Sequence, residues 1–329
     1  MNRAFIILVF VLSSLLINSC SNGFESDGNI IYTFEVLPKE VSADSALKQL
    51  NKRIEIFGIR DYKTEVISDN QIKVQLPYIN ESDRLYRFLL TPAHLAFWET
   101  YSFNNPEIYV ALTKADSVSR VLPLENPSDS SQNNRGIFNY LLPNFKQNGG
   151  AYFPGNGPIM GYAKIADTAY INTIFSNPQI NKLFPREMKL LWSAKYSKYM
   201  NNSNQYEYFE LFILYDKYAD NEATFPVYFI EDATCSISEN EHPEINFTMN
   251  EKGAEEWKSL TGKNLGRAIA IVLDNKVFAA PHVMSQIEGG RSQITGDFTI
   301  EEATDLANVL KAGRYNFTLK LKSQERISE

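Results

Sequence analysis

Cysteine and histidine are both scarce in this sequence, which has two cysteines and three histidines among 329 residues. The histidines, His94, His242 and His282, are far apart, and none has a second metal ligand three or four residues away. The sequence therefore predicts no metal site. Of the cysteines, Cys235 lies in a stretch with the alternation of a strand, and we expect it to be a buried, unreactive thiol.

Clusters of positive charge are also lacking. The chain has 32 Lys and Arg against 39 Asp and Glu, a formal net charge of −7. Nucleic acids and anionic lipid surfaces are bound by clustered Lys and Arg, so this balance argues against either as a main partner.

The N-terminus has the one long apolar run, over residues 4–17 after the basic residue Arg3. This run is too short to cross a hydrocarbon layer of about 30 Å, so it predicts a signal peptide, residues 1–19. The next residues, Ile-Asn-Ser-Cys, resemble the lipobox of bacterial lipoproteins, in which the cysteine carries the acyl chains. We expect a lipidated Cys20, a polar tether over 20–29 and no disulfide in the mature chain; an ordinary cleaved leader is the alternative.

The C-terminal third has strong local signals. Asp274-Asn275 is turn chemistry that joins two apolar runs into a hairpin. Thr299 and Glu302 make a capping box that predicts the start of a helix, and Gly313 predicts its end. The expected elements are strands at 268–273, 276–280 and 292–295, a helix from 299 to 311 and an alternating strand from Tyr315 to Leu321.

The N-terminal part and the segment after residue 227 have comparable patterns. Apolar residues at helical spacing end at Gly58, Asp69-Asn70 predicts a hairpin turn, and Asn80 and Asn250 are expected helix caps. The expected strands are 30–36, 64–68, 72–76, 94–101, 234–238 and 244–249.

Residues 102–226 have a different character. They contain half of the Phe, Tyr and Trp residues of the chain, enough for a small core of their own. Residues 126–134 have no apolar side chain other than a proline, and we expect a loop there. We call residues 102–226 the insert.

Several runs together resemble one known family. The string IVLDNKVFAAP, followed by GGRSQITGDFTIEEATDLANVLKAG, is similar to the "VLDGxVxSAP … GGxxQITGxFTxEEAxxLAxxLRAG" pattern of the first periplasmic domain of SecD, an auxiliary subunit of the Sec export machine. ALKQLNKRIEIFGI, NQIKVQLPYI and INFTMNEKGAEEWKSLT resemble other parts of that domain. LFPREMKLLWSAKYSKYM and YEYFELFILYDK resemble the head subdomain inserted in fused SecDF proteins of the Bacteroidota.

This resemblance implies an α+β fold, with a ferredoxin-like mixed base built from two discontinuous segments and an inserted aromatic-rich α+β head subdomain. The expected division is 30–101 for the first half of the base, 102–226 for the head, 227–322 for the second half and 323–329 for a tail. In the family, transmembrane helices follow this domain and hold the ion-coupling residues. The chain stops at Glu329, so we expect the extracytoplasmic domain alone, held at a membrane by lipid and without ion-coupled transport.

No catalytic or cofactor-binding constellation is found in the sequence. Gly262-Lys263 follows Trp257, where a phosphate-binding loop needs its first glycine. The glycines from Gly155 to Gly161 are spaced one residue too long for a dinucleotide fingerprint. We therefore predict a protein that is not an enzyme and has no cofactor and no small-molecule substrate.

Two groups of residues are candidate contacts for a polypeptide. Aromatic residues of the insert would capture apolar segments, with a place in its own core as the alternative: Tyr152, Phe153, Trp192 and Tyr196. The loop of Gly289, Gly290 and Arg291 would present backbone N–H groups to a peptide, and the alternative is that its glycines only permit a sharp connection.

The predicted function is that of a lipid-anchored protein facing the periplasm, on either membrane, that binds exported, unfolded polypeptides or docks on the Sec translocase. The alternative is an envelope scaffold or adhesion module that keeps the fold without an export role.

Overall fold

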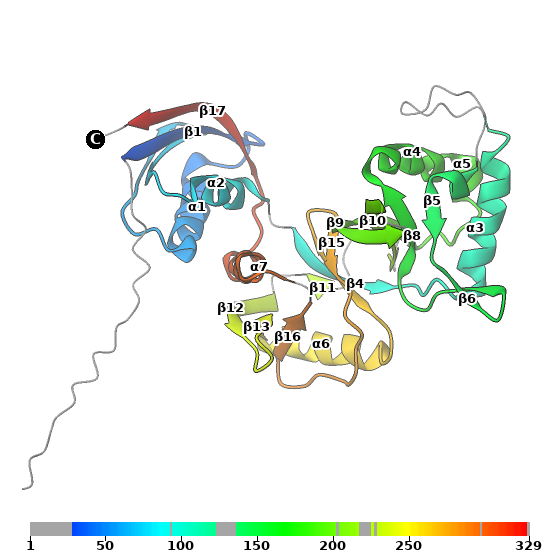
Figure 1. Cartoon of the computed structure of the whole chain (residues 1–329). Coiled ribbons are helices and arrows are strands. Elements are labelled where there is room, and N and C mark those ends of the chain that lie inside the picture. The colour runs from blue at the N-terminus through cyan, green and yellow to red at the C-terminus, as the bar shows by residue number, and fades with distance from the viewer. Residues whose placement is uncertain are drawn as a thin grey trace, which may run out of the picture.

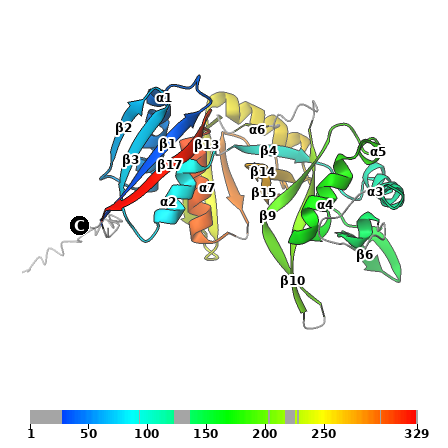
Figure 2. The same ribbon diagram turned by 90° about the horizontal axis from the view of Figure 1, so that it is seen from above.

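The structure, a computed structural model, describes residues 28–327 apart from 93, 123–135, 202–203, 217–224, 227–228 and 297. Cys20, the signal peptide and the predicted loop at 126–134 lie outside these residues. The described chain is an α+β protein with a ferredoxin-like sheet at one end and the insert at the other (Figures 1 and 2).

The ferredoxin-like unit is built from residues 28–90 and the last described strand of the chain. Its four strands are antiparallel in the order β17-β1-β3-β2, and α1 and α2 supply the crossovers. Its apolar residues alternate along β1 and β3, which buries one face of the sheet against the helices. The elements are β1 (Asn29–Leu37), α1 (Ala43–Phe57), β2 (Lys63–Ser68), β3 (Gln71–Pro77), α2 (Ser82–Leu90) and β17 (Thr318–Ile327).

A second unit, the three-stranded unit, lies in the middle of the molecule (Figure 2). Its antiparallel sheet has the order β12-β13-β16, and α7 packs on β12 and β13. Its helices start at the caps expected from sequence, since the Asn250 side chain accepts from the Gly253 N–H and Thr299 and Glu302 form a complete capping box. The elements are β12 (Ile230–Ile237), β13 (Pro243–Met249), α6 (Glu251–Lys263), β16 (Arg291–Thr295) and α7 (Ile300–Ala312).

The largest sheet joins the insert to the flanking segments. Its order is β11-β4-β14-β15-β9-β10-β8-β5, and an extra pairing between β4 and β10 closes five of these strands into a ring. Asp274 and Asn275 have positive φ (48° and 62°) and turn β14 into β15, as predicted. The strands are β4 (Leu95–Thr100), β5 (Leu141–Pro143), β8 (Ile159–Lys164), β9 (Met188–Asn201), β10 (Asn204–Tyr215), β11 (Phe225–Pro226), β14 (Ile269–Leu273) and β15 (Lys276–Ala279).

Helices and a separate hairpin complete the insert around this sheet (Figure 1). The hairpin β6–β7 is a two-stranded sheet of its own. The elements are α3 (Pro106–Ser119), the 3-10 turn η1 (Ile137–Asn139), β6 (Phe145–Asn148), β7 (Ala151–Pro154), α4 (Ile165–Ser176) and α5 (Pro178–Asn181).

Two large apolar cores divide the molecule. One core runs without a break from the ferredoxin-like unit into the three-stranded unit, from Phe34 and Leu50 to Trp257 and Leu306. The insert has a second core of its own, which includes Ile174. The two segments that flank the insert therefore share one core, although they contribute to three different sheets.

Three details differ from the sequence expectations. Helix α2 begins after Glu81, without a cap from Asn80, because the Ser82 hydroxyl bonds to the backbone of Ile79 instead. Strand β17 continues to Ile327 through the expected tail, since β1 offers it a partner as far as Asn29. Of the described strands in the expected second half of the base, β17 alone joins the ferredoxin-like sheet.

Candidate functional site

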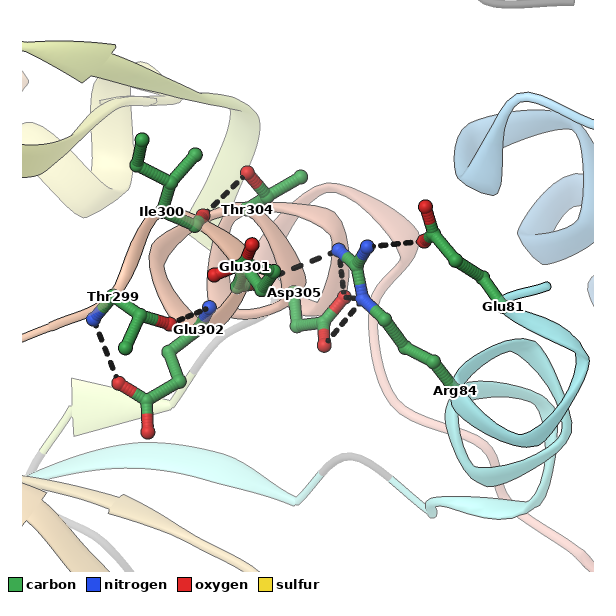
Figure 3. A network of polar contacts seen from close by, with 8 residues as sticks. All are labelled: Glu81, Arg84, Thr299, Ile300, Glu301, Glu302, Thr304 and Asp305. Atoms are coloured by element: carbon green, nitrogen blue, oxygen red, sulfur yellow. Dashed lines mark hydrogen bonds and ion pairs between the residues drawn. The ribbon is translucent and has the colours of Figure 1, made fainter. Parts of the chain in front are cut away.

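Helix α7 connects the parts of the molecule through two ion pairs. On its side toward the ferredoxin-like unit, Asp305 receives bonds from Arg84 Nε (2.9 and 3.0 Å) and Nη2 (2.7 Å), and Arg84 Nη1 also reaches Glu81 at 2.5 Å (Figure 3). The hydrogen bond with Asp305 raises the pKa of Arg84. A fork-shaped contact of this kind fixes orientation as well as distance, so α2 and α7 are locked together.

On the other side, the first turn of α7 is tied to the insert. Lys195 of β9 donates to Glu302 Oε2 at 2.5 Å, and its ammonium lies 5.6 Å from the centre of the Phe298 ring. Glu302 also accepts from the Thr299 N–H in the capping box. One carboxylate thus serves both the helix start and the contact to the insert.

A buried arginine hydrogen-bonds to both segments that connect the ferredoxin-like unit to the rest of the chain, one at the end of α2 and one after α7. The side chain of Arg53, from α1, is 1 % exposed and donates to the carbonyl oxygens of Phe88 (3.0 Å), Thr91 and Gly313 (3.1 Å). Its guanidinium lies 3.5 Å from the centre of the Tyr315 ring. Burial lowers the pKa of Arg53, although the nearby Tyr315 and Asp274 oppose that shift. The carbonyls after α2 and α7 are thereby held at one point.

The insert has a cavity of about 480 Å³ beside the β14–β15 turn, with both apolar and polar side chains in its walls. Trp192 lines it, together with side chains of α4, α5 and β9 and with Asn275 and Lys276 of the turn. Trp192 is 6 % exposed, and its indole N–H donates to Asn172 at 2.9 Å. Trp192 is therefore part of the insert core and presents only one wall to the cavity.

The other three aromatic candidates do not line this cavity. Tyr152 and Phe153 lie on β7 of the separate hairpin and are 69 % and 53 % exposed, and Tyr196 on β9 is 47 % exposed. The structure thus separates the four candidates into a buried wall residue, an exposed hairpin pair and an exposed strand residue. Their role in binding remains a prediction.

The glycine loop before β16 has the geometry of a tight connection. Gly289 and Gly290 have φ of 78° and 69°, where a side chain would be strained, and a Cβ on Gly290 would lie 2.9 Å from the Ala254 Cβ. The Gly290 carbonyl accepts from the Met249 N–H and so begins the pairing of β13 with β16. Arg291 is exposed and is the first residue of β16.

A second hollow, with mainly apolar walls, was not predicted from the sequence. We call it the β16 slot: it encloses about 200 Å³ between β16 and residues 281–287 and is lined by Trp257, Ile269 and Val283, with Met284, 89 % exposed, at its edge. Its walls come from six separate segments of the chain, between Phe97 and Ile294, so no local pattern marks it. The one sequence signal is a run of apolar residues, Val283, Met284 and Ile287, in an irregular segment before a short strand.

The sequence is similar to known proteins of one family. Residues 226–316 match the family model described as the SecDF P1 head subdomain. Protein translocase subunit SecD of Rhodothermus marinus is 29% identical over 295 residues, which cover 83% of this chain and 44% of that protein. The SecD of Leptotrichia buccalis is 43% identical over 79 residues, 24% of this chain and 20% of that protein.

The chain contains a SecD-like periplasmic domain. A crystal structure of SecDF in the Super-membrane-facing form has the same fold over 90% of this chain and 30% of its own length, with 18% identity and a TM-score of 0.50. The chain spans less than half of the curated SecD relatives named above. The α+β fold with a ferredoxin-like base and an inserted subdomain, expected from the resemblance, is confirmed.

The family model places the head subdomain in a different segment from the one expected. The P1 head model covers 226–316, which the sequence analysis assigned to the base, whereas the expected head was 102–226. We therefore keep the name insert for 102–226 and leave its boundaries as a prediction.

The described residues were also searched for membrane-spanning helices and for metal sites. Among residues 28–327 with their gaps, no helix combines the length and the apolar character that crossing a bilayer requires. The same residues contain no group of three or more His, Cys, Asp or Glu side chains placed to hold a metal ion.

Proposed function

We propose that this SecD-like domain binds segments of exported polypeptide and docks on the Sec translocase. The observation that carries the proposal is the coincidence of a SecD-like sequence with exposed aromatic side chains on the insert. Tyr152 and Phe153 lie on a two-stranded hairpin whose two strands have no other partner strand among the described elements, and they offer apolar area to a passing chain.

The proposal includes a lipid anchor on Cys20, with the domain facing the periplasm. Mass spectrometry of the protein extracted from membranes should find acyl chains on the N-terminal peptide, and Cys20→Ser should release the protein from the membrane fraction. Recovery of an unmodified Cys20 peptide would contradict this part of the proposal without affecting polypeptide binding.

Polypeptide binding is tested by titration of the full chain, in detergent, with a fluorescent secretory protein that has been reduced and alkylated so that it stays unfolded. We expect saturable binding to the unfolded form and none to the folded form. The double change Tyr152→Ser with Phe153→Ser should weaken binding about tenfold or more, because two large apolar contacts are removed. Val121→Ser removes an exposed apolar side chain elsewhere, on a residue that is 77 % exposed, and should leave binding unchanged.

Docking is tested by affinity capture from solubilised envelope. Recovery of Sec subunits supports it. Recovery of a folded envelope protein, together with no binding of unfolded polypeptide, would overturn the export role and favour the scaffold or adhesion function.

A further inference from the structure

Strand β16 lies at the edge of the three-stranded sheet. Among the described strands, β13 pairs with one side of β16 and none pairs with the other. In Figure 1, β16 lies beside β13 and above α6. A sheet edge of this kind presents a row of backbone donors and acceptors to any extended chain.

The register shows which groups face outward. The Met249 N–H donates to the Gly290 carbonyl, and β13 and β16 pair from Thr248↔Arg291 onward. Since hydrogen-bonded and non-bonded pairs alternate along an antiparallel ladder, the groups of Ser292 and Ile294 face β13. The N–H and C=O groups of three residues therefore face the open side: Arg291, Gln293 and Thr295.

The β16 slot lies along this open side. Its walls are formed by residues of β16 and by buried apolar side chains of other elements, among them Trp257 and Ile269. The indole N–H of Trp257 is buried and has no hydrogen-bond partner among the described residues. A volume of about 200 Å³ suits one large apolar side chain.

The two edge strands of the ferredoxin-like sheet carry charged side chains that β16 has almost none of. Strand β17 carries Lys320, Lys322 and Arg326, and Lys63 and Glu65 lie on β2. Charged side chains of this kind discourage pairing with another chain. Strand β16 has one charged residue, Arg291, at its first position.

We infer that an extended segment of polypeptide adds to β16 as a fourth strand and places one apolar side chain in the β16 slot. This inference rests on the proposed function and names the site for it. The occupant is an extended peptide because the open groups at 291, 293 and 295 repeat at the spacing of a strand. Main-chain bonds supply binding to many sequences, and the slot supplies a preference for an apolar residue.

The test compares two substitutions at one position. Gln293→Pro removes the outward N–H and leaves the ladder with β13 intact, because proline is accepted at an edge where its nitrogen faces away from the partner strand. Gln293→Ala removes the same side chain and keeps the N–H. In the titration with unfolded polypeptide described above, the proline variant should bind about tenfold more weakly than wild type, and the alanine variant should bind like wild type.

A second measurement covers the case in which the proline variant folds poorly. In wild-type protein saturated with the polypeptide, hydrogen exchange should slow at the amides of Gln293 and Thr295. Unchanged exchange there, or wild-type binding by a folded Gln293→Pro, would overturn the inference while leaving the proposed function standing. A wild-type protein with no affinity at all would instead overturn the proposed function.

The slot is tested independently with Met284→Asp, which places a charge at its edge, and with Met284→Leu as the matched control. The aspartate variant should bind severalfold more weakly, and the leucine variant should bind like wild type. If wild-type protein forms dimers that Gln293→Pro abolishes, as measured by sedimentation, the occupant is a second copy of the chain and the inference is wrong.

Discussion

The ferredoxin-like unit and the insert lie at opposite ends of the molecule and differ in how completely they are closed (Figure 2). In the ferredoxin-like unit, one buried arginine holds the exit and the return of the chain, and ion pairs such as Lys73–Glu65 cover the outer face of the sheet. The insert has a cavity of about 480 Å³ at the edge of its core and a hairpin with exposed aromatic side chains. A unit whose connecting segments are held by hydrogen bonds suits a rigid scaffold. A unit with a cavity and exposed aromatic side chains suits transient contact with other chains.

The strongest test of this comparison is the removal of Arg53. Arg53→Met keeps much of the side-chain volume but leaves the carbonyls of Phe88, Thr91 and Gly313 without their donor. We expect a loss of about 3–5 kcal/mol in the free energy of unfolding, because several charge-assisted hydrogen bonds to buried acceptors disappear together. Denaturant titration measures the loss, and Arg60→Met, at an exposed arginine, should change it by less than about 0.5 kcal/mol. Equal effects would show that Arg53 does not hold the unit closed.

The next test asks whether the two cores unfold locally and independently of each other. Leu50 and Ile174 are fully buried in the first and second core, and truncation of either to alanine should cost about 2–5 kcal/mol. Because the cores do not share these residues, Leu50→Ala should speed hydrogen exchange mainly in β1 and β3, and Ile174→Ala mainly in α4 and β8. Identical exchange patterns in the two variants would show that the cores open as one.

The third test concerns the link through α7. Asp305→Asn keeps the shape of the side chain but removes the charge that Arg84 contacts in a fork (Figure 3). The pair is partly exposed, so we expect a loss of about 1 kcal/mol in the free energy of unfolding. The Asp232–Lys311 pair is more exposed, and Asp232→Asn should cost about half as much or less. A larger loss at Asp232 would contradict the view that geometry makes the Arg84 contact strong.

The sequence predicted most of the ferredoxin-like unit because its signals are local. Helical spacing predicted α1 with Gly58 at its end, and turn chemistry predicted the Asp69-Asn70 turn between β2 and β3. Arg53 was not predicted as a central residue, because its partners lie 35 to 260 residues away in the chain. A charged residue in an amphipathic helix is expected on the exposed face, and only the tertiary structure supplies the carbonyls that make burial favourable.

The candidate sites of the insert were harder to predict for a different reason. Trp192 and Tyr196 are four residues apart, so a regular strand would place them on one face. In the structure the register shifts between them: Leu211 pairs with Trp192, while Phe209 pairs with Tyr196. Ser193 stabilises this bulge, since its hydroxyl donates to the Lys195 carbonyl and accepts from the Glu210 N–H. The bulge separates a buried Trp192 from an exposed Tyr196, and no pattern in the sequence marks it.

The smallest expected effect comes from Glu210, which lies next to this bulge in the insert. Burial raises the pKa of its carboxyl above the usual value, and the hydrogen bond from the Ser197 hydroxyl, at 3.0 Å, opposes the shift only in part. A group whose pKa is higher in the folded protein binds more protons there, so its contribution to stability is greatest below its unfolded pKa of 4.5 and is lost as pH rises through the folded pKa.

Glu210→Gln removes this dependence while keeping a hydrogen-bonding side chain. The difference in unfolding midpoint between the variant and wild type should therefore move in favour of the variant from pH 4 to pH 7, as measured by denaturant titration at both values. Glu107→Gln, at an exposed glutamate of α3, is the matched control and should show no such trend. A flat difference for Glu210→Gln would mean that the carboxylate is as well solvated in the insert as in the unfolded chain, and the insert would then be open at this strand as well as at its cavity.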